Sequence, residues 1–301
     1  MAYLLVGLAI LFWASSPAVG KILLSTLNPF QLLFYALLFC LLFMLAIFFI
    51  QGKLSDLKDI SKEKSGKRLL LGITGTLLYE IFYYGSLSLL RAQETLIINY
   101  LWPIFVVIFA RIVLGEKFSP FDGISFTLAF IGLFLSITQG RRGEFSPGSI
   151  WGVLLALGAA ISYGIFSILS KKFHRDNAVD IFYSFLFAWC IVAVYLGITE
   201  GFSPLSAQEV TLLLFVGITN YALAYFCWIQ AIKRGKTAII SLLIYLTPFV
   251  AIIYIRIFLK EIISLWSLLG LSLIVFGIIL KIVGENRIRT NNLNARSSLR
   301  Q

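Results

Sequence analysis

The chain has 301 residues, of which 59% are hydrophobic and only 13% are charged, and its mean hydropathy is +0.94. Because soluble proteins carry about 25% charged residues, this composition excludes an ordinary soluble enzyme or binding module and indicates a polytopic membrane protein. The net charge of +11 does not indicate nucleic-acid binding, because most of the 25 Lys and Arg residues fall on alternate loops and on the tail. The exceptions are Lys21, Arg91, Arg141, Arg142, Arg256 and Lys260.

Ten apolar segments follow one another along the chain, each close to the roughly 20 residues that a spanning helix needs. They cover residues 3–25, 29–51, 69–90, 92–114, 118–139, 149–171, 178–198, 208–232, 237–259 and 262–283. The first lacks a basic leader and is followed by nine others, so we expect a retained helix rather than a cleaved signal. The basic loops near Lys62, Lys171 and Lys233 are typical of cytoplasmic loops, which predicts that both termini are cytoplasmic.

Several of these segments carry polar groups, prolines or amphipathic rings near their middle. In chain order these are Trp13, Pro17, Tyr79, Glu80, Tyr83, Asn99, Tyr100, Trp102, Pro103, Tyr163, Tyr245 and Pro248. An ionisable residue at this depth costs several kcal/mol and normally faces a protein interior or a water-filled path. A proline inside a helix leaves a backbone carbonyl without its usual partner. We therefore predict a polar, aromatic-walled cavity at the middle of the membrane.

An internal repeat relates the two halves of the chain. The run Tyr100-Leu101-Trp102-Pro103 recurs as Tyr245-Leu246-Thr247-Pro248, at an offset of 145 residues. At the same offset Arg111 matches Arg256, Glu116 matches Glu261 and Gly132 matches Gly277. Because each half holds an odd number of helices, the sequence predicts an inverted five-plus-five repeat, which is typical of transporters. The predicted units are residues 1–140, residues 141–284 and a basic, disordered cytoplasmic tail over residues 285–301.

Glu80 is the acid that lies farthest from any predicted helix end. Its functional interpretation is a proton carrier or a partner for a substrate amine. The alternative is a structural carboxylate that hydrogen-bonds to Asn99 or to the backbone of a broken helix. The sequence leaves both interpretations open, since burial would favour the neutral carboxyl group and a nearby cation would favour the charged one.

The aromatic residues at mid-membrane are Tyr and Trp, although the chain has 27 Phe residues available for plain packing. Tyr79 and Tyr83 are four residues apart and share a helix face. These rings lie too far from the helix ends to belong to an interfacial belt. We interpret them as a cavity lining with hydrogen-bonding hydroxyl and indole groups, with core packing as the alternative. Trp13 and Tyr163 have comparable depths in the two opening helices. Gly72, Gly75 and Gly132 are expected to permit close helix contact.

Other chemistry has little support in the sequence. The single histidine, His174, lies in a basic loop, and Cys40, Cys190 and Cys227 lie within apolar segments, so no metal or disulfide pattern is predicted. There is no Gly-x4-Gly-Lys-Ser/Thr loop for ATP, and no nucleophile elbow or paired acids for a hydrolase. We expect no cofactor and no enzymatic activity.

The chain resembles the drug/metabolite transporter superfamily of the EamA type over residues 3–283, through its helices, its repeat, its two prolines and Gly115-Glu116. Tyr79-Glu80-Ile81 and Asn99-Tyr100-Leu101-Trp102-Pro103 are similar to motifs of the bacterial aromatic amino-acid exporters. That resemblance implies export of aromatic amino acids across the inner membrane through a central cavity. It also implies substrate contacts at Tyr79, Tyr83, Tyr100, Trp102, Tyr163 and Ser241. Lys260-Glu261 replaces the Gly-Glu that the family carries in its second half.

Three functions remain as hypotheses. The first is a secondary exporter of aromatic or other apolar amino acids that works by alternating access, with Asn99 or Ser241 meeting the substrate carboxylate. The second is an exporter of cationic aromatic drugs or of small metabolites in general. The positive charge of such a drug can bind the faces of aromatic side chains. The third, a membrane receptor or structural subunit, is disfavoured by the short loops. The expected partners are the lipid bilayer and a small molecule, and the oligomeric state is left open.

Overall fold

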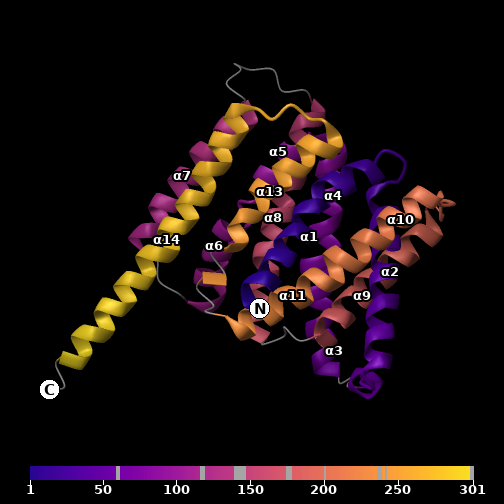
Figure 1. Cartoon of the computed structure of the whole chain (residues 1–301), viewed down its shortest axis with the longest axis horizontal. Helices are drawn as coiled ribbons and strands as arrows, with labels where there is room; N and C mark the ends of the chain where they lie inside the picture. The colour runs from indigo at the N-terminus through magenta and orange to yellow at the C-terminus, as the bar shows by residue number, and fades with distance from the viewer. Residues whose placement is uncertain are drawn as a thin grey trace.

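The computed structural model describes residues 1–58, 62–115, 119–138, 147–173, 178–199, 201–235, 239–240 and 243–298 (Figure 1). Within these ranges every regular element is a helix, which confirms the predicted all-α class. The first half holds α1 (Ala2–Leu23), α2 (Pro29–Ile50), η1 (Leu54–Lys58), α3 (Lys62–Gly72), η2 (Ile73–Leu78), α4 (Tyr79–Leu89), α5 (Ala92–Asn99), α6 (Trp102–Leu114) and α7 (Pro120–Thr138). The second half holds α8 (Pro147–Phe173), α9 (Ala178–Ile198), α10 (Ala207–Phe215), η3 (Val216–Leu223), α11 (Ala224–Arg234), η4 (Ile244–Leu246), α13 (Thr247–Tyr254), η5 (Ile255–Leu259) and α14 (Leu265–Ser298).

Seven helical stretches among the described residues are long and apolar enough to cross a bilayer. They are Ala2–Leu23, Pro29–Ile50, Ala92–Leu114, Ile150–Phe173, Ala178–Ile198, Ala207–Arg234 and Leu265–Gly284. Two shorter apolar helices, Pro120–Ser136 and Ile244–Leu259, lie within further predicted segments. The elements α3, η2 and α4 cover the remaining predicted segment, 69–90. The structure therefore confirms a polytopic helical protein, and each predicted segment contains helix.

Both predicted helix interruptions at Pro103 and Pro248 occur where expected. The helix ends at Asn99 and restarts at Trp102, so Pro103 is the second residue of α6. In the second half α13 begins at Thr247 with Pro248 as its second residue. A proline at the start of a helix removes no intrahelical hydrogen bond, because the first N–H groups have no partner in any case.

The two halves place corresponding elements at one constant offset. The starts of α3 and α10, α4 and α11, α6 and α13, and α7 and α14 are each separated by the offset of the sequence repeat. Gly115 ends α6 in the left-handed conformation with φ of 70°, and Lys260 adopts the same conformation with φ of 57°. The residue type changes between the halves while the backbone turn is kept, although a left-handed residue with a side chain is strained by about 1–2 kcal/mol.

The halves also exchange their opening helices. α1 packs against α11 and α13 of the second half, whereas α8 packs against α4 and α6 of the first half. α2 and α9 contact each other. A buried ion pair, Arg68 Nε to Asp180 Oδ1 at 2.7 Å, ties α3 to α9. The core between the halves is therefore made of helices from both, and a cavity placed there is lined by both.

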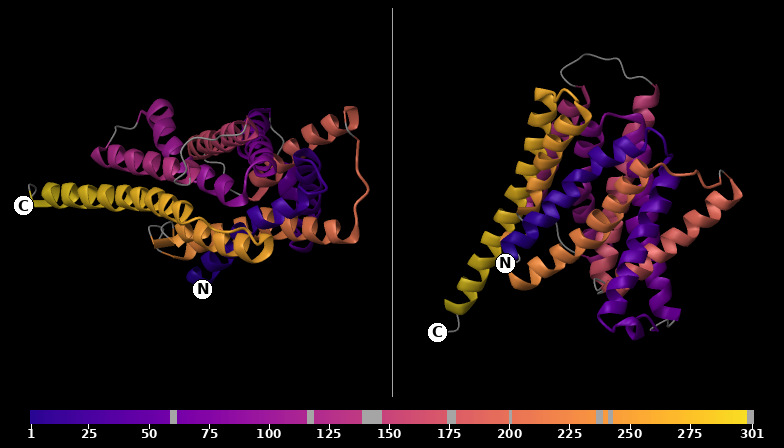
Figure 2. Two further views of the ribbon diagram at one scale, coloured as in Figure 1. Left: turned by 90° about the horizontal axis from the view of Figure 1, so that it is seen from above. Right: turned by 45° about the vertical axis from the view of Figure 1, so that its right-hand side comes forward.

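The last helices of the two halves form an antiparallel pair, seen side by side in Figures 1 and 2. Phe121 at the start of α7 lies against Gly284, far along α14, and Gly132 lies against Gly270 near the start of α14. A salt bridge of 2.7 Å joins Asp122 to Lys281. Residues early in α7 contact residues late in α14, and residues later in α7 contact residues early in α14. These two corresponding helices therefore run in opposite directions.

The tail differs from the prediction of disorder over 285–301. α14 continues as a helix through Ser298, and residues 299–301 lie outside the described residues. Beyond Gly284 this stretch contains no proline and no glycine, so nothing in it stops a helix that has already formed its first turns.

Candidate functional site

A cavity lies between the halves and holds about 160 Å³ of space that the centre of a water molecule can occupy. It is lined by Trp13, Ser16, Pro17, Tyr79, Glu80, Tyr83, Leu96, Asn99, Tyr100, Trp102, Tyr163, Asn220, Tyr221, Tyr225, Ile244, Thr247 and Ala251. Helices of both halves contribute, from α1, α4, α5 and α6 to α8, η3, α11, η4 and α13. Most of the polar and aromatic residues that the sequence placed at mid-membrane are thus brought together.

Some predicted site residues do not line this cavity. Pro103, Tyr245 and Pro248 are buried but lie outside the lining, so these two prolines shape the helices rather than the wall. Ser241 lies outside the described residues. The remaining predicted residues, Trp13, Pro17, Tyr79, Glu80, Tyr83, Asn99, Tyr100, Trp102 and Tyr163, all face the cavity.

One wall of the cavity is a continuous aromatic cluster centred on Tyr163. The ring of Tyr163 lies 5.0 Å from that of Trp102 at 75°, and 5.0 Å from that of Tyr79 at 49°, measured between centroids. Tyr79 stacks with Tyr83 at 5.9 Å. These separations are typical of favourable ring pairs. The wall therefore offers ring edges and faces to a flat ligand.

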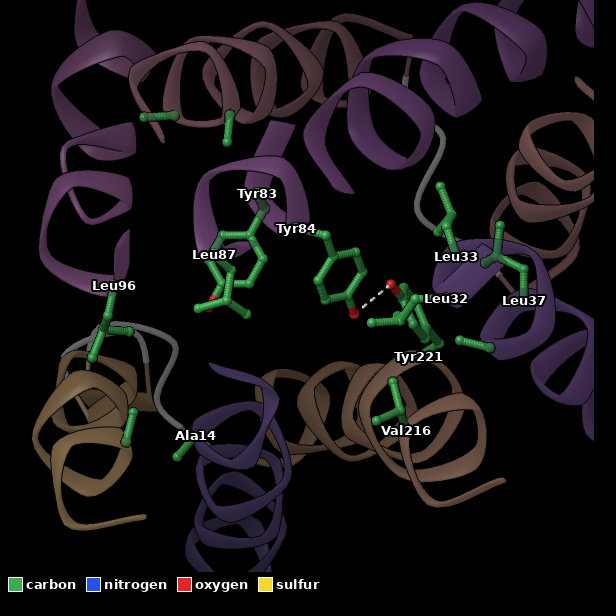
Figure 3. Close-up of a cluster of buried hydrophobic side chains, with 14 of the residues drawn as sticks. Ala14, Leu32, Leu33, Leu37, Tyr83, Tyr84, Leu87, Leu96, Val216 and Tyr221 are labelled. Atoms are coloured by element: carbon green, nitrogen blue, oxygen red, sulfur yellow. Dashed lines mark hydrogen bonds between the residues drawn. The ribbon is translucent and has the colours of Figure 1, made fainter. Parts of the chain in front are cut away.

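A second group of lining residues is polar and includes Glu80. The Glu80 carboxyl group lies near the Tyr221 hydroxyl. The Tyr221 hydroxyl lies 3.2 Å from that of Tyr84 (Figure 3). Tyr84 in turn lies near Ser16 on α1. The Tyr84–Tyr221 contact joins α4 of the first half to η3 of the second half at this cavity.

Two asparagines complete the polar lining, and each has an amide atom without a partner among the described residues. Asn99 Nδ2 donates to the Tyr79 hydroxyl at 3.3 Å, and its Oδ1 is the unpaired atom. Asn220 contacts Ser15 Oγ at 3.3 Å and Thr219 Oγ1 at 3.0 Å through Oδ1, and its Nδ2 is the unpaired atom. Trp13 Nε1 donates to the Asn220 backbone oxygen at 3.1 Å.

The turns that aim these residues are π-helical. η2 ends at Leu78, directly before Tyr79 and Glu80, and η3 contains Asn220 and Tyr221. An extra residue in a helical turn rotates the side chains that follow, and such turns are frequent at functional sites. Nothing in the amino-acid pattern indicated them.

The cavity is also lined by residues beyond the predicted site residues, namely Ser16, Leu96, Asn220, Tyr221, Tyr225, Ile244, Thr247 and Ala251. A signal for Tyr225 was present. Tyr221 and Tyr225 repeat the four-residue spacing of Tyr79 and Tyr83, and Tyr225 follows Glu80 by the offset of the sequence repeat. Its ring meets that of Trp13 edge-on at 5.3 Å.

The side chains of Lys21, Gln93 and Glu261 form a group of contacts that we call the latch. The latch holds the turn between α4 and α5 against α1 and against the segment between η5 and α14. Lys21 Nζ donates to the carbonyl oxygens of Leu87 and Leu90 at 2.5 and 2.7 Å. Glu261 Oε1 accepts from the backbone N–H of Ala92 at 2.9 Å, where a helix N-terminus favours negative charge. Gln93, which is fully buried, donates to the Ile262 carbonyl at 3.0 Å. The latch residues thus join the two halves beside the first turn of α5, which supplies Leu96 and Asn99 to the cavity.

Several known proteins are similar in sequence to this chain over most of its length. Uncharacterized transporter YvbV of Bacillus subtilis is 30% identical over 218 residues, covering 69% of this chain and 70% of its own. Aromatic amino acid exporter YddG of Ancylobacter novellus is 27% identical over 181 residues, covering 59% of this chain and 62% of its own. Uncharacterized inner membrane transporter YhbE of Escherichia coli K12 is 22% identical over 284 residues, covering 91% and 88%.

The sequence profile described as the EamA-like transporter family matches residues 1–138 and 150–283, which is nearly the whole chain. The resemblance seen in the sequence is confirmed, as is the expectation of a transporter rather than an enzyme. The protein is a multi-pass protein of the bacterial inner membrane. Through that match, and through helices that surround a shared central cavity, the chain belongs to the EamA-like transporter family.

Proposed function

We propose that this transporter is a secondary exporter of aromatic amino acids that works by alternating access. The observation that carries the proposal is the cavity between the halves, whose wall pairs Tyr163 with Trp102 and Tyr79. A flat substrate ring on this wall gains about 0.5–1.5 kcal/mol per ring pair beyond simple burial. Two such pairs favour Phe or Trp over an aliphatic side chain of similar size by roughly 5-fold to more than 100-fold. A relative of this chain is named as an aromatic amino acid exporter, which agrees with this substrate class.

Alternating access requires two bundles that can rock about a shared site. We infer that residues 1–140 and 141–284 are two inverted five-helix repeats, which together make ten spans with both termini in the cytoplasm. Three observations support this: the common offset between corresponding elements, the antiparallel α7 and α14, and the match of one family profile to residues 1–138 and 150–283. An interface between inverted repeats is where transporters bind substrate.

Labelling of single cysteines in intact cells tests this topology. Lys62→Cys and Asn292→Cys should be shielded from an impermeant maleimide, and Gly143→Cys should react. The experiment uses a background without Cys40, Cys190 and Cys227. Shielding of Gly143→Cys together with reaction of Lys62→Cys would show that the orientation is wrong.

Transport by the purified protein in proteoliposomes tests the substrate class. Labelled tryptophan should exchange across the membrane and be displaced by Phe and Tyr, with leucine and threonine at least about 5-fold weaker. Equal transport of leucine or threonine would indicate a general metabolite exporter instead.

A second candidate, an exporter of cationic aromatic compounds, is favoured by the Glu80 carboxyl group in the same cavity as the rings. Ring faces also attract cations. Competition between tryptophan and a quaternary ammonium dye separates these two functions.

A further inference from the structure

The described lining of the cavity carries one carboxyl group and no basic side chain. Glu80 is the acid, and no Lys, Arg or His stands among the lining residues that the structure describes. An amino acid brings both an ammonium and a carboxylate group. The ammonium finds an acceptor group at Glu80, whereas the substrate carboxylate finds no cation among the described lining residues. A buried charge without a partner is strongly unfavourable, so the lining favours cations.

Asn99 adds a hydrogen-bond acceptor to the cavity lining. The residue is 5% exposed, and its Nδ2 already donates to the Tyr79 hydroxyl at 3.3 Å. Its Oδ1 has no hydrogen-bond partner among the described residues, although it is buried in a residue that lines the cavity. A buried acceptor left unpaired is costly, and a bound N–H donor removes that cost.

Asn220 adds a second amide at the same cavity. Ser15 Oγ lies 2.7 Å from the Phe12 carbonyl oxygen, and Thr219 Oγ1 lies 2.6 Å from that of Phe215, so each hydroxyl proton has a close backbone acceptor. A hydroxyl has one proton to donate. A half-turn of the Asn220 amide, which exchanges its nitrogen and oxygen, lets Nδ2 donate to both hydroxyl oxygens and makes Oδ1 the buried atom without a partner. This orientation uses every proton once and leaves an acceptor for the ligand.

We propose that Glu80, Asn99 and Asn220 form a subsite for an ammonium group, and that the cavity accepts aromatic primary amines, for which a carboxylate is dispensable. The inference rests on the proposed transport function and narrows its substrate class. The ammonium donates to the Glu80 carboxylate and to the two amide oxygens, while the ring lies on the wall formed by Tyr79, Trp102 and Tyr163. An amino acid binds through the same two features, its ring and its ammonium.

Binding of four indole compounds to the full-length protein in nanodiscs tests the subsite. Tryptamine is a monocation at neutral pH, tryptophan a zwitterion, indole-3-propionate an anion and 3-ethylindole a neutral compound of similar shape. We expect tryptamine to bind at least as tightly as tryptophan. Since hydrogen bonds to a charged group are the stronger ones, 3-ethylindole and indole-3-propionate should each bind at least about 10-fold more weakly than tryptamine.

Variants assign that preference to particular residues. Glu80→Gln and Asn99→Leu should each reduce the ratio of tryptamine to 3-ethylindole affinity by about 10-fold. Asn99→Asp keeps the shape and adds charge, so it should preserve or raise the ratio. Gln31→Leu is the matched control, because Gln31 is a buried amide outside the cavity that donates to Ser203 Oγ at 2.7 Å. It should leave the ratio unchanged.

The outcomes separate the two proposals. Binding of tryptophan without binding of tryptamine would overturn the ammonium subsite and leave the amino-acid exporter standing. A tryptamine preference that survives both Glu80→Gln and Asn99→Leu would also overturn the subsite. Failure of every indole compound to bind folded wild-type protein would overturn the aromatic substrate class itself, and with it both proposals.

Discussion

Gly132 on α7 and Gly270 on α14 meet backbone to backbone. A Cβ atom added to either glycine would overlap the carbonyl oxygen of the other. Gly277 is the counterpart of Gly132 in the repeat, and it faces Ser125, which is the counterpart of Gly270. The contact is therefore reciprocal between the halves, and it joins the helix pair at two points.

Replacing Gly132 by alanine should lower stability, because the new methyl group has no space beside a fixed backbone. Overpacking typically destabilises a protein by about 1–3 kcal/mol. Gly123→Ala is the control on the same helix, since a Cβ there meets nothing within 4 Å. Thermal unfolding in detergent should show a lower Tm for Gly132→Ala, and an unchanged or higher Tm for Gly123→Ala. Equal Tm values for the two variants would contradict the close contact.

Trp102→Ala should weaken aromatic amino-acid transport far more than Phe130→Ala does. Trp102 forms the wall with Tyr163, whereas Phe130 is 67% exposed on α7 and faces lipid or solvent. Losing one ring pair together with its buried area should reduce the apparent tryptophan affinity by about 10-fold or more. Uptake of labelled tryptophan into proteoliposomes measures this. Transport that is indifferent to Trp102→Ala would mean that the wall does not bind substrate.

Glu80→Gln separates a proton carrier from a structural carboxyl group. The amide keeps the shape and an acceptor oxygen near Tyr221 but cannot release a proton. If Glu80 carries protons, the variant should lose net transport driven by a pH gradient and retain substrate exchange at equal pH. Both are measured in the same proteoliposomes. Wild-type dependence on the pH gradient in the variant would exclude Glu80 as the carrier.

The latch should control access to the cavity at one end. Glu261→Ala removes the acceptor for the Ala92 and Gln93 N–H groups and one of the acids near Lys21. We expect Ala251→Cys, which lines the cavity, to react several-fold faster with an impermeant maleimide in this variant. Glu209→Ala is the control, because Glu209 contacts Ser206 and Thr26 rather than the latch. An unchanged labelling rate would show that the latch holds no gate.

The sequence predicts the helical segments more completely than it predicts which residues line the cavity. Depth in the membrane can be read from position in an apolar segment, and Tyr79, Glu80, Asn99 and Trp102, which share one depth, line one cavity. Tyr245 and Pro248 are predicted on the same ground to lie at the cavity or at a hinge, and they lie outside the cavity lining. Depth alone does not say which face of a helix a residue occupies.

The amino-acid sequence by itself determined the class of the protein, its helical segments, its broken helices and its internal repeat. These depend on local properties: apolar length, the missing N–H of proline and the recurrence of one motif. The tertiary structure alone decided which side chains face the cavity and how the halves are joined. The π-helical turn η2 directly precedes α4, which carries Glu80, and η3 contains Tyr221, and both residues line the cavity. Lys21 donates to carbonyl oxygens of residues 66 and 69 positions later in the chain. Such contacts depend on the packing of distant helices, because a helix turns its residues through every direction and only its neighbours select the buried face.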